Sequence, residues 1–178
     1  IWQLKWELED LAFRAMQPKQ YQLIAKQLHE KRGVREKYID KAIKQIRQAV
    51  AQAGITADVA GRPKHIYSIW KKMQRKSVDF DELYDIRAIR VLVDDIASCY
   101  SVLGLVHQLW VPIPGEFDDY IAQPKSNNYQ SLHTAVSGPD GLGLEVQIRT
   151  WKMHEHAEMG VAAHWRYKEG GKAQGEFE

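Results

Sequence analysis

The first third of the chain places apolar residues at intervals of three and four. They are Leu4, Leu8 and Leu11, then Leu23, Ile24 and Leu28, and then Ile39, Ile43, Ile46 and Val50. This spacing predicts helices, because it gathers apolar side chains on one helix face. We expect Pro18 and Gly33 to separate the helices and Gly54 to end the last one. Residues 1–53 are therefore predicted to form a helical segment, whose scattered cations suit a solvated face.

After Gly54 the pattern alternates between strands and helices. Strands are predicted at 55–62, 86–93, 129–138 and 143–150, and the last two are joined by "PDGLG", in which Asp-Gly is a turn signal. Helices are predicted at 64–76 with Pro63 in the first turn, from Asp94 or Asp95 to Trp110, and at 152–167. The fold class expected is α+β, with a mixed sheet of about five strands flanked by helices.

Composition limits the classes of function. The chain has 178 residues, 44% of them hydrophobic, and a net charge of +2, which predicts one globular domain without a strong field for nucleic acid or membranes. No apolar run approaches the roughly 18 residues of a membrane-spanning helix. The single Cys99 predicts a cytoplasmic protein without a disulfide framework. The absence of an initiator Met and the ending "KEGGKAQGEFE" suggest a piece of a longer protein, with a disordered tail at 171–178.

A basic stripe is predicted on the helix at 64–76. Steps of about 100° per residue bring Lys64, Lys71 and Arg75 together, with Arg62 and Lys72 beside them. With free amides at the helix N-terminus, these cations would make a site for polyphosphate. The alternative is an ordinary amphipathic helix with a hydrated basic face.

Polar side chains also interrupt two strands. Glu145, Gln147 and Arg149 share one face of the strand at 143–150, which is either a ligand-binding face or an exposed sheet face. Arg90 lies inside the strand at 86–93, where a charge is costly unless it is paired or faces a ligand. Asp85 stands at the mouth of that strand, a common place for a metal-binding carboxylate in phosphoryl-transfer enzymes.

Two familiar kinds of site are not supported by the sequence. His154-Glu155 would need a second histidine at position 158 for a zincin motif, and that residue is Glu158. No GxxxxGK loop occurs, so a bound ATP would not be held by a Walker loop. The segment "EFDDYIAQPKSNNYQSLHT" at 116–134 is too polar to serve mainly as core, and a polar ligand is the better interpretation.

Taken together, five segments resemble the synthetase domain of the RelA/SpoT family. They are "GRPKHIYSIWKKM", "DELYDIRAIRVLV", "EFDDYIAQPKSNNYQSLHT", "LEVQIRT" and "MHEHAEMGVAAHWRYKEG". The resemblance implies a nucleotidyltransferase-like synthetase domain at 54–170, preceded by a helical connector at 1–53. It also implies transfer of pyrophosphate from ATP to the 3′-hydroxyl of GDP or GTP, which gives AMP and the stringent-response alarmones ppGpp or pppGpp.

The resemblance assigns roles to individual residues. Arg62 and Arg90 match arginines that sandwich the adenine of ATP, and Lys64 and Lys72 match phosphate-binding lysines. Asp85 matches the Mg²⁺ ligand, and Glu145 matches the carboxylate that activates the acceptor hydroxyl and is a second candidate metal ligand. In the acceptor pocket, Tyr129 matches the residue that stacks on guanine, with Lys125, Asn127 and His133 beside it.

Two departures from the family pattern carry information. Asn128 stands where the family usually has Gly, and Asn tolerates positive φ best after Gly, so we expect the loop to survive. Members that also hydrolyse the alarmone carry a basic Arg-x-Lys-Asp at 116–119, whereas this chain has Glu116, Asp118 and Asp119. This acidic variant implies a synthesis-dedicated type that favours GDP.

Two rival hypotheses belong to other classes. One is a catalytically silent module of the same fold that binds guanine nucleotide for regulation. The other is a nucleic-acid binder that uses the basic helix, which the near-neutral net charge disfavours. Partners implied by the family are ATP and GDP or GTP, and the ribosome and uncharged tRNA only through regions outside this sequence.

Overall fold

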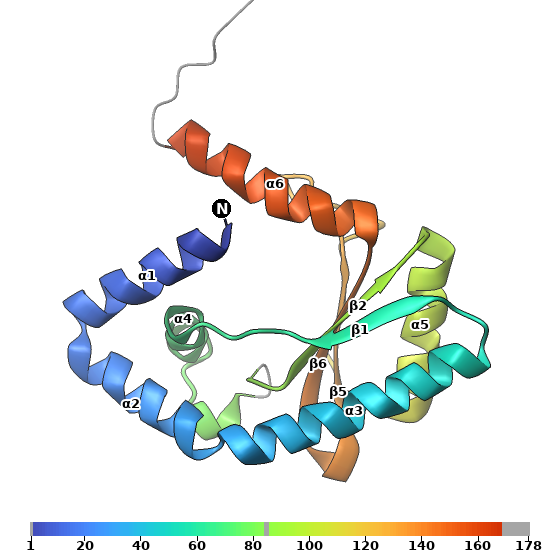
Figure 1. The fold of residues 1–178 in the computed structure, drawn as a ribbon, viewed down its shortest axis with the longest axis horizontal. Coiled ribbons are helices and arrows are strands. Elements are labelled where there is room, and N and C mark those ends of the chain that lie inside the picture. The colour runs from blue at the N-terminus through green and yellow to red at the C-terminus, as the bar shows by residue number, and fades with distance from the viewer. Residues whose placement is uncertain (1, 84–85, 169–178) are drawn as a thin grey trace, which may run out of the picture.

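The computed structural model of the chain describes residues 2–83 and 86–168 (Figure 1). Its helices are α1 (Trp2–Met16), α2 (Pro18–Glu30), α3 (Arg32–Gln52), α4 (Ile66–Lys76), α5 (Ile96–Leu109) and α6 (Trp151–Lys168). Its strands are β1 (Ala57–Gly61), β2 (Ala88–Val93), β3 (Val111–Pro112), β4 (Asp118–Asp119), β5 (Leu132–Ser137) and β6 (Gly143–Thr150). Short 3₁₀ turns lie at Phe80–Glu82 and Pro139–Gly141.

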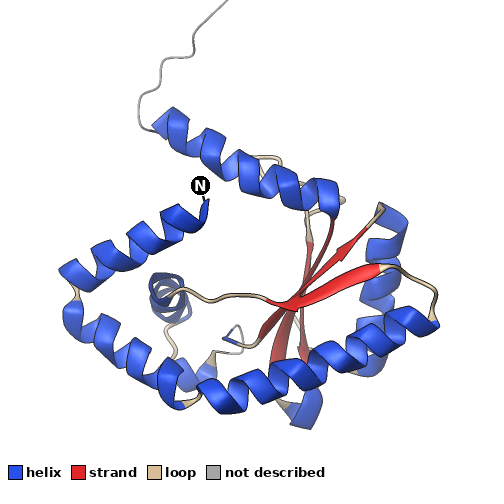
Figure 2. Ribbon diagram, in the orientation of Figure 1, coloured by secondary structure: helices blue, strands red, loops and turns tan. Residues whose placement is uncertain are grey.

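The strands form one mixed sheet in the order β1-β2-β6-β5-β3, and β4 also pairs with β5. β2 and β6 run parallel, while the other pairs are antiparallel. Helices lie on both faces of the sheet (Figure 2). The α+β class and the four predicted strands are confirmed. The two strands that the sequence pattern did not predict, β3 and β4, are two residues long, which is too short for an alternating pattern to be visible.

The helix breaks follow the predicted signals with one shift. Pro18 is the first residue of α2, where its missing N–H costs nothing, and Gly54 follows α3 with a φ of +71°. Gly33 was expected to separate two helices, yet it lies in the first turn of α3, and the break falls at Lys31. Lys31 ends α2 and precedes α3 without any intervening loop.

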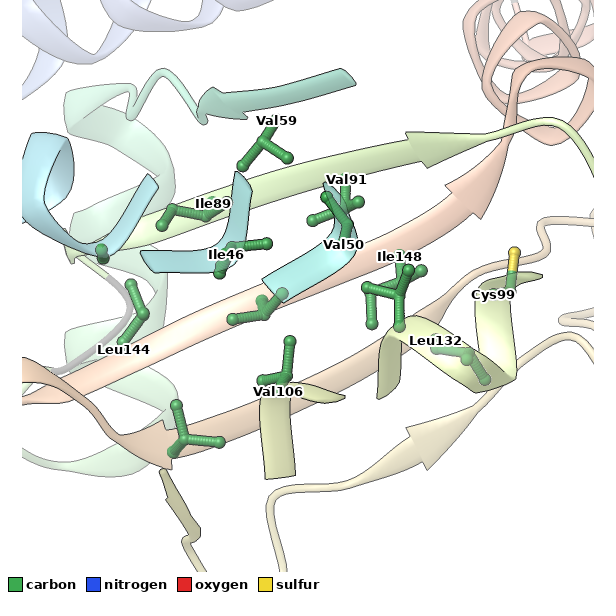
Figure 3. Packing of buried hydrophobic residues seen from close by; sticks show 14 of the residues in the cluster. Ile46, Val50, Val59, Ile89, Val91, Cys99, Val106, Leu132, Leu144 and Ile148 are labelled. Carbon is green, nitrogen blue, oxygen red and sulfur yellow. The ribbon is translucent and has the colours of Figure 1, made fainter. Parts of the chain in front are cut away.

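One face of the sheet packs against α3 and α5. Ile46 and Val50 of α3 meet Val59, Ile89 and Val91 of β1 and β2 (Figure 3). Cys99 and Val106 of α5 belong to the same buried cluster as Leu132, Leu144 and Ile148 of β5 and β6 (Figure 3). Burying these side chains supplies the main apolar core of the fold. In β6 the residues Leu144, Val146 and Ile148 point into this core, as the strand alternation predicted.

The N-terminal helices pack against α4 through a second, smaller core. Phe13 of α1 and Ile24 of α2 contact Ile69 of α4 in a cluster that also contains Phe80, Leu83 and Ile86. Phe13 contacts Trp70 of α4 with a ring separation of 4.9 Å. In the parts of the chain that the structure describes, no helix combines the length and apolar character needed to cross a membrane.

Candidate active site

Polar side chains gather on the sheet face opposite the main core. Glu145, Gln147 and Arg149 come from β6, Arg90 from β2 and His133 from β5. The register pairs Gln147 with Arg90 on one side and with His133 on the other. Glu145 is paired with Ala88 and Ala135, and these two small side chains leave space on both sides of its carboxylate. The ligand-face interpretation of β6 is therefore the one that the geometry favours over an exposed sheet face.

Glu145 lies at the centre of a cationic cluster. Its Oε2 is 3.5 Å from the Nζ atoms of both Lys64 and Lys72, and its Oε1 is 3.6 Å from Arg62 Nη1. Gln147 Nε2 donates a hydrogen bond of 3.1 Å to Oε1. Only 8% of Glu145 is exposed, so these contacts act in a poorly screened environment.

The protonation state of Glu145 follows from two opposing causes. Burial alone would raise its pKa, but attraction to Lys64, Lys72 and Arg62, together with the bond from Gln147, outweighs burial. The net result holds the pKa of Glu145 well below its usual range. Glu145 is therefore ionised at neutral pH, and one carboxylate is shared among three cations that a phosphate chain could also bind.

The start of α4 differs from the sequence prediction. Pro63 and Lys64 lie before the helix, which begins at Ile66 after the extended residue His65. The helix amides were expected to be free for phosphate, yet Asp10 of α1 accepts hydrogen bonds from Tyr67 N at 2.9 Å and Ile66 N at 3.4 Å. A carboxylate satisfies donors at a helix start and suits the helix dipole. The cations of this region therefore act without the helix N-terminus.

The basic stripe is also arranged differently from the prediction. Because Lys64 precedes the helix, the 100° spacing does not apply to it. Lys72, Arg75 and Lys76 border pockets, whereas Lys71 packs over the ring of Tyr67 at 4.8 Å.

A central pocket of about 350 Å³ opens beside Glu145, a volume typical of small-molecule sites. It is lined by Arg62, Lys72, Arg75, Lys76, Glu116, Asp118, Tyr120, Lys125, His133, Thr134, Ala135, Glu145 and Gln147. Arg75 and Lys76 were not assigned a role from the family resemblance. Their spacing of three and four residues from Lys72 on one helix was the available signal.

Two smaller pockets adjoin the central one. The lysine pocket is lined by Trp6, Arg62, Pro63, Lys64, His65, Ser68, Ile69, Lys72, Leu83 and Ile86. The arginine pocket is lined by Trp6, Arg62, Pro63, Arg90, Tyr129, Gln147, Arg149, Ala157 and Glu158. Arg62 borders all three pockets, so it stands at their junction. The structure thus brings the four predicted ATP-binding residues, Arg62, Lys64, Lys72 and Arg90, around two connected pockets.

The residues predicted to bind the acceptor do not all line the same pocket. Lys125 and His133 line the central pocket, but Tyr129 lines the arginine pocket. The hydroxyl of Tyr129 lies 2.7 Å from His133 Nε2, and Lys125 Nζ is 5.4 Å from the centre of the Tyr129 ring. Burial, with Arg62, Lys125 and Arg149 nearby, lowers the pKa of His133 to about 4 although Glu145 acts in the opposite direction. His133 is therefore neutral at pH 7.

The loop before Tyr129 has the conformation that the sequence predicted. Asn128 adopts a φ of +63°, which confirms that Asn replaces Gly at a left-handed position. Asn127 is exposed and lies outside the pockets described above, and its Oδ1 accepts a hydrogen bond from Tyr129 N at 3.1 Å. Asn127 thus shapes the loop that presents Tyr129.

The three carboxylates of the acidic cluster do not act together. Glu116 and Asp118 line the central pocket, and Glu116 lies 3.8 Å from Lys76. Asp119 instead accepts hydrogen bonds from Ala122 N, Ile121 N and the hydroxyl of Tyr100. Asp118 and Asp119 are neighbours in β4, and adjacent strand residues point to opposite faces. The sequence treated them as one group because β4 was not predicted.

The predicted metal site falls partly outside the described residues, because Asp85 lies there. Among the residues that the structure does describe, no group of three or more His, Cys, Asp or Glu side chains could hold a metal ion. Glu145, the second candidate ligand, is surrounded by three cations, which would repel a further positive charge.

Comparison with known families gives one match. The family described as "Region found in RelA / SpoT proteins" matches residues 61–172, which include all three pockets except for Trp6.

Curated relatives agree with this family. A GTP pyrophosphokinase of Escherichia coli K12 is 55% identical over 98% of this chain and 24% of the relative. A GTP pyrophosphokinase of Myxococcus xanthus is 49% identical over 94% of this chain and 22% of the relative. The chain thus spans about a quarter of the length of the curated relatives it matches.

Solved structures share the fold. Small alarmone synthetase 1 of Bacillus subtilis, bound to its product pppGpp, is 25% identical with a TM-score of 0.62, covering 82% of this chain and 83% of that chain. Small alarmone synthetase 2 of the same organism has a TM-score of 0.63 at 23% identity, covering 76% and 80% of the two chains.

Proposed function

The chain belongs to the RelA/SpoT family, and we propose that it transfers pyrophosphate from ATP to the 3′-hydroxyl of GDP or GTP. The observation that carries the proposal is the position of Glu145, which borders the central pocket while it contacts the cations of the lysine pocket. The relatives named GTP pyrophosphokinase and the structural neighbour bound to pppGpp support it. The products would be AMP and ppGpp or pppGpp, the alarmones of the stringent response.

The donor ATP would occupy the lysine and arginine pockets. Lys64, Lys72 and Arg62 supply positive charge for the phosphate chain, and Arg62 and Arg90 supply planar guanidinium groups for the adenine. Arg62 can contact both the phosphate chain and the adenine of ATP, because it lines both pockets.

The acceptor would occupy the central pocket. Lys125, Tyr120 and neutral His133 offer a cation and two flat rings for a guanine nucleotide, and Lys125 Nζ lies 4.5 Å from the Tyr120 ring centre. Tyr129, oriented by His133, is our candidate for stacking on guanine, although reaching the central pocket would require its ring to leave the arginine pocket.

The reaction then needs one bond to form and one to break. The acceptor's 3′-oxygen attacks the β-phosphorus of ATP, the bond between the α- and β-phosphates breaks, and AMP leaves. Glu145 accepts the proton of the 3′-hydroxyl, a general-base contribution of roughly 10²- to 10⁴-fold. Lys64, Lys72 and Arg62 stabilise the charge on the transferred phosphates, which is the main source of catalysis in phosphoryl transfer.

The contacts of Glu145 also explain how a carboxylate of such low pKa could act as a base. While its three cations are unoccupied by phosphate, they stabilise its ionised form. Donor phosphates would take over Lys64, Lys72 and Arg62 and so withdraw that stabilisation from Glu145. Its pKa would rise on ATP binding, which makes it a better base when the acceptor is present.

Mg²⁺ is part of the proposal through Asp85 alone. Enzymes of this chemical class hold Mg²⁺ with one or two carboxylates and the substrate phosphates, and the ion neutralises phosphate charge. Because three cations surround Glu145, it does not suit Mg²⁺ as a second ligand in this arrangement.

We place the reaction in the cytoplasm, as the single Cys99 predicts. Any ribosome or tRNA coupling belongs to the full-length protein.

The test is incubation with Mg²⁺, ATP and GDP followed by chromatography. The proposal predicts AMP and ppGpp in equal amounts. Binding of GDP without either product would identify the rival, a catalytically silent regulatory module.

A further inference from the structure

Trp6 of α1 borders both pockets assigned to ATP. Its side chain is half-buried and lines the lysine pocket and the arginine pocket, next to Arg62 and Pro63 in each. Among the residues that the structure describes, Trp6 is the only one outside 61–172 that lines either pocket. The helical segment before the sheet domain therefore reaches the donor site through one aromatic ring.

Two residues on the same face of α1 as Trp6, Asp10 and Phe13, hold this ring in place. Asp10, one turn after Trp6, accepts the hydrogen bonds from Ile66 N and Tyr67 N at the start of α4. Phe13, one turn further, packs on the rings of Tyr67 and Trp70 with centres 5.6 and 4.9 Å away. The Trp6 ring itself lies 4.4 Å from His65 at 41°. Residues spaced by four and three lie on the same helix face, so α1 is docked along α4.

Helix α6 also contributes to the arginine pocket. Ala157 and Glu158 line the pocket together with Trp6, and Figure 1 shows the first turns of α1 beside α6. The same pocket is lined by Arg90, which is half-buried, and Arg149, which is buried. This combination of planar cations and an indole suits a flat, electron-rich base.

We propose that Trp6 contacts the adenine of the donor ATP, so that α1 forms one wall of the donor site. This inference rests on the proposed function, since ATP is the occupant. Trp6 takes no part in the chemistry, and its contribution is to affinity and placement of the base. A flat ring against a base is typically worth a factor of about 5 to 100 in affinity. The segment at 1–53 then has a binding role in addition to that of a connector.

The experiment compares Trp6→Leu with Trp6→Phe, because both keep an apolar side chain and only the second keeps a flat ring. Leu8→Ala is the control, because Leu8 lies on the exposed side of the same helix with 47% of its surface accessible. Calorimetry measures binding of the non-hydrolysable ATP analogue AMPCPP and, separately, of GDP. Steady-state kinetics give KM for ATP and kcat.

We expect Trp6→Leu to weaken AMPCPP binding at least 5-fold and to raise KM for ATP, with GDP affinity and kcat nearly unchanged. Trp6→Phe should retain most of the affinity, and Leu8→Ala should match the unaltered protein. Equal AMPCPP affinity in Trp6→Leu and the unaltered protein would overturn the inference and leave the proposed function standing. If the unaltered protein bound GDP but not AMPCPP, the donor assignment and this inference would fail together.

Discussion

At the scale of single residues, the site is organised by unequal numbers of opposite charges. The single carboxylate of Glu145 contacts Lys64, Lys72 and Arg62, and Gln147 donates a hydrogen bond to it. When no nucleotide is bound, this carboxylate contacts the three half-buried cations that phosphates would bind, and it offsets part of their mutual repulsion. Binding and chemistry should therefore respond differently when its charge is removed.

The first prediction concerns Glu145→Gln. Turnover should fall at least 100-fold because the proton acceptor is lost. AMPCPP should bind as tightly as before or more tightly, since phosphates no longer compete with a carboxylate for the three cations. Calorimetry and product chromatography test the two halves, with exposed Glu155→Gln as a control of equal charge change. A loss of AMPCPP affinity as large as the loss of turnover would contradict the exchange of partners.

The second prediction concerns pH. The folded protein lowers the pKa of His133 from 6.5 to about 4, so between these values the unfolded chain binds a proton that the folded chain does not. The contribution of His133 to the free energy of unfolding is therefore fully present above pH 6.5, and it is lost as the pH falls towards 4. Urea unfolding of His133→Gln should therefore show a weaker decline of stability over this window than the unaltered protein. Parallel declines would mean that His133 titrates normally in the fold.

At the scale of elements, regular patterns were predicted well and contacts between distant elements were not. Alternation in β6 placed Glu145, Gln147 and Arg149 correctly on one face, because that pattern is local. The start of α4 was misplaced, because its cap, Asp10, lies 56 residues away from Ile66. No local pattern reveals such a partner. Trp6 was not predicted as a pocket residue for the same reason, because it is far in sequence from the other residues that line the pockets. Asp119 was grouped with Glu116 and Asp118 because the pairing of β4 with β5 is likewise a tertiary contact, which no local pattern reveals.

The third prediction tests the cap of α4. Asp10→Ala should lower the free energy of unfolding by about 0.5–2 kcal/mol, the usual cost of losing a helix cap. Asp10→Asn should recover part of that loss, because its amide oxygen can still accept one hydrogen bond. Thermal or urea unfolding measures the change, and exposed Glu7→Ala serves as the matched control on α1. Equal stability of Asp10→Ala and Glu7→Ala would show that the cap is not needed.

At the scale of the whole molecule, three pockets from distant parts of the chain meet at Arg62. Trp6 of α1 lines the two pockets that we assign to the donor, whereas Glu116, Asp118 and Lys125 of the 116–134 segment line the central pocket that we assign to the acceptor. Of the three pockets, Glu116 and Asp118 line only the central one, which Arg75 and Lys76 also line, and Glu116 lies 3.8 Å from Lys76. Their position fits an influence on the acceptor's own phosphates and none on the donor.

The fourth prediction reverses these charges with Glu116→Arg and Asp118→Lys together. Charges at a partly screened surface interact by about 1 kcal/mol, so the ratio of kcat/KM for GTP over GDP should rise several-fold, and more at low salt. The matched control reverses the exposed Asp94 and Glu155, which changes the net charge equally. An unchanged ratio with activity preserved would show that the cluster does not sense the acceptor phosphates.

The most direct test of the account follows the transferred group itself. The protein is given Mg²⁺, GDP and ATP labelled on its γ-phosphate, and 3′-deoxy-GDP replaces GDP in a parallel reaction. The account predicts that the label appears in ppGpp in an amount equal to the AMP released, with no labelled nucleotide product from 3′-deoxy-GDP or from Glu145→Gln. Label recovered only as free phosphate beside ADP, or transfer that persists without a 3′-hydroxyl, would contradict pyrophosphate transfer at this site.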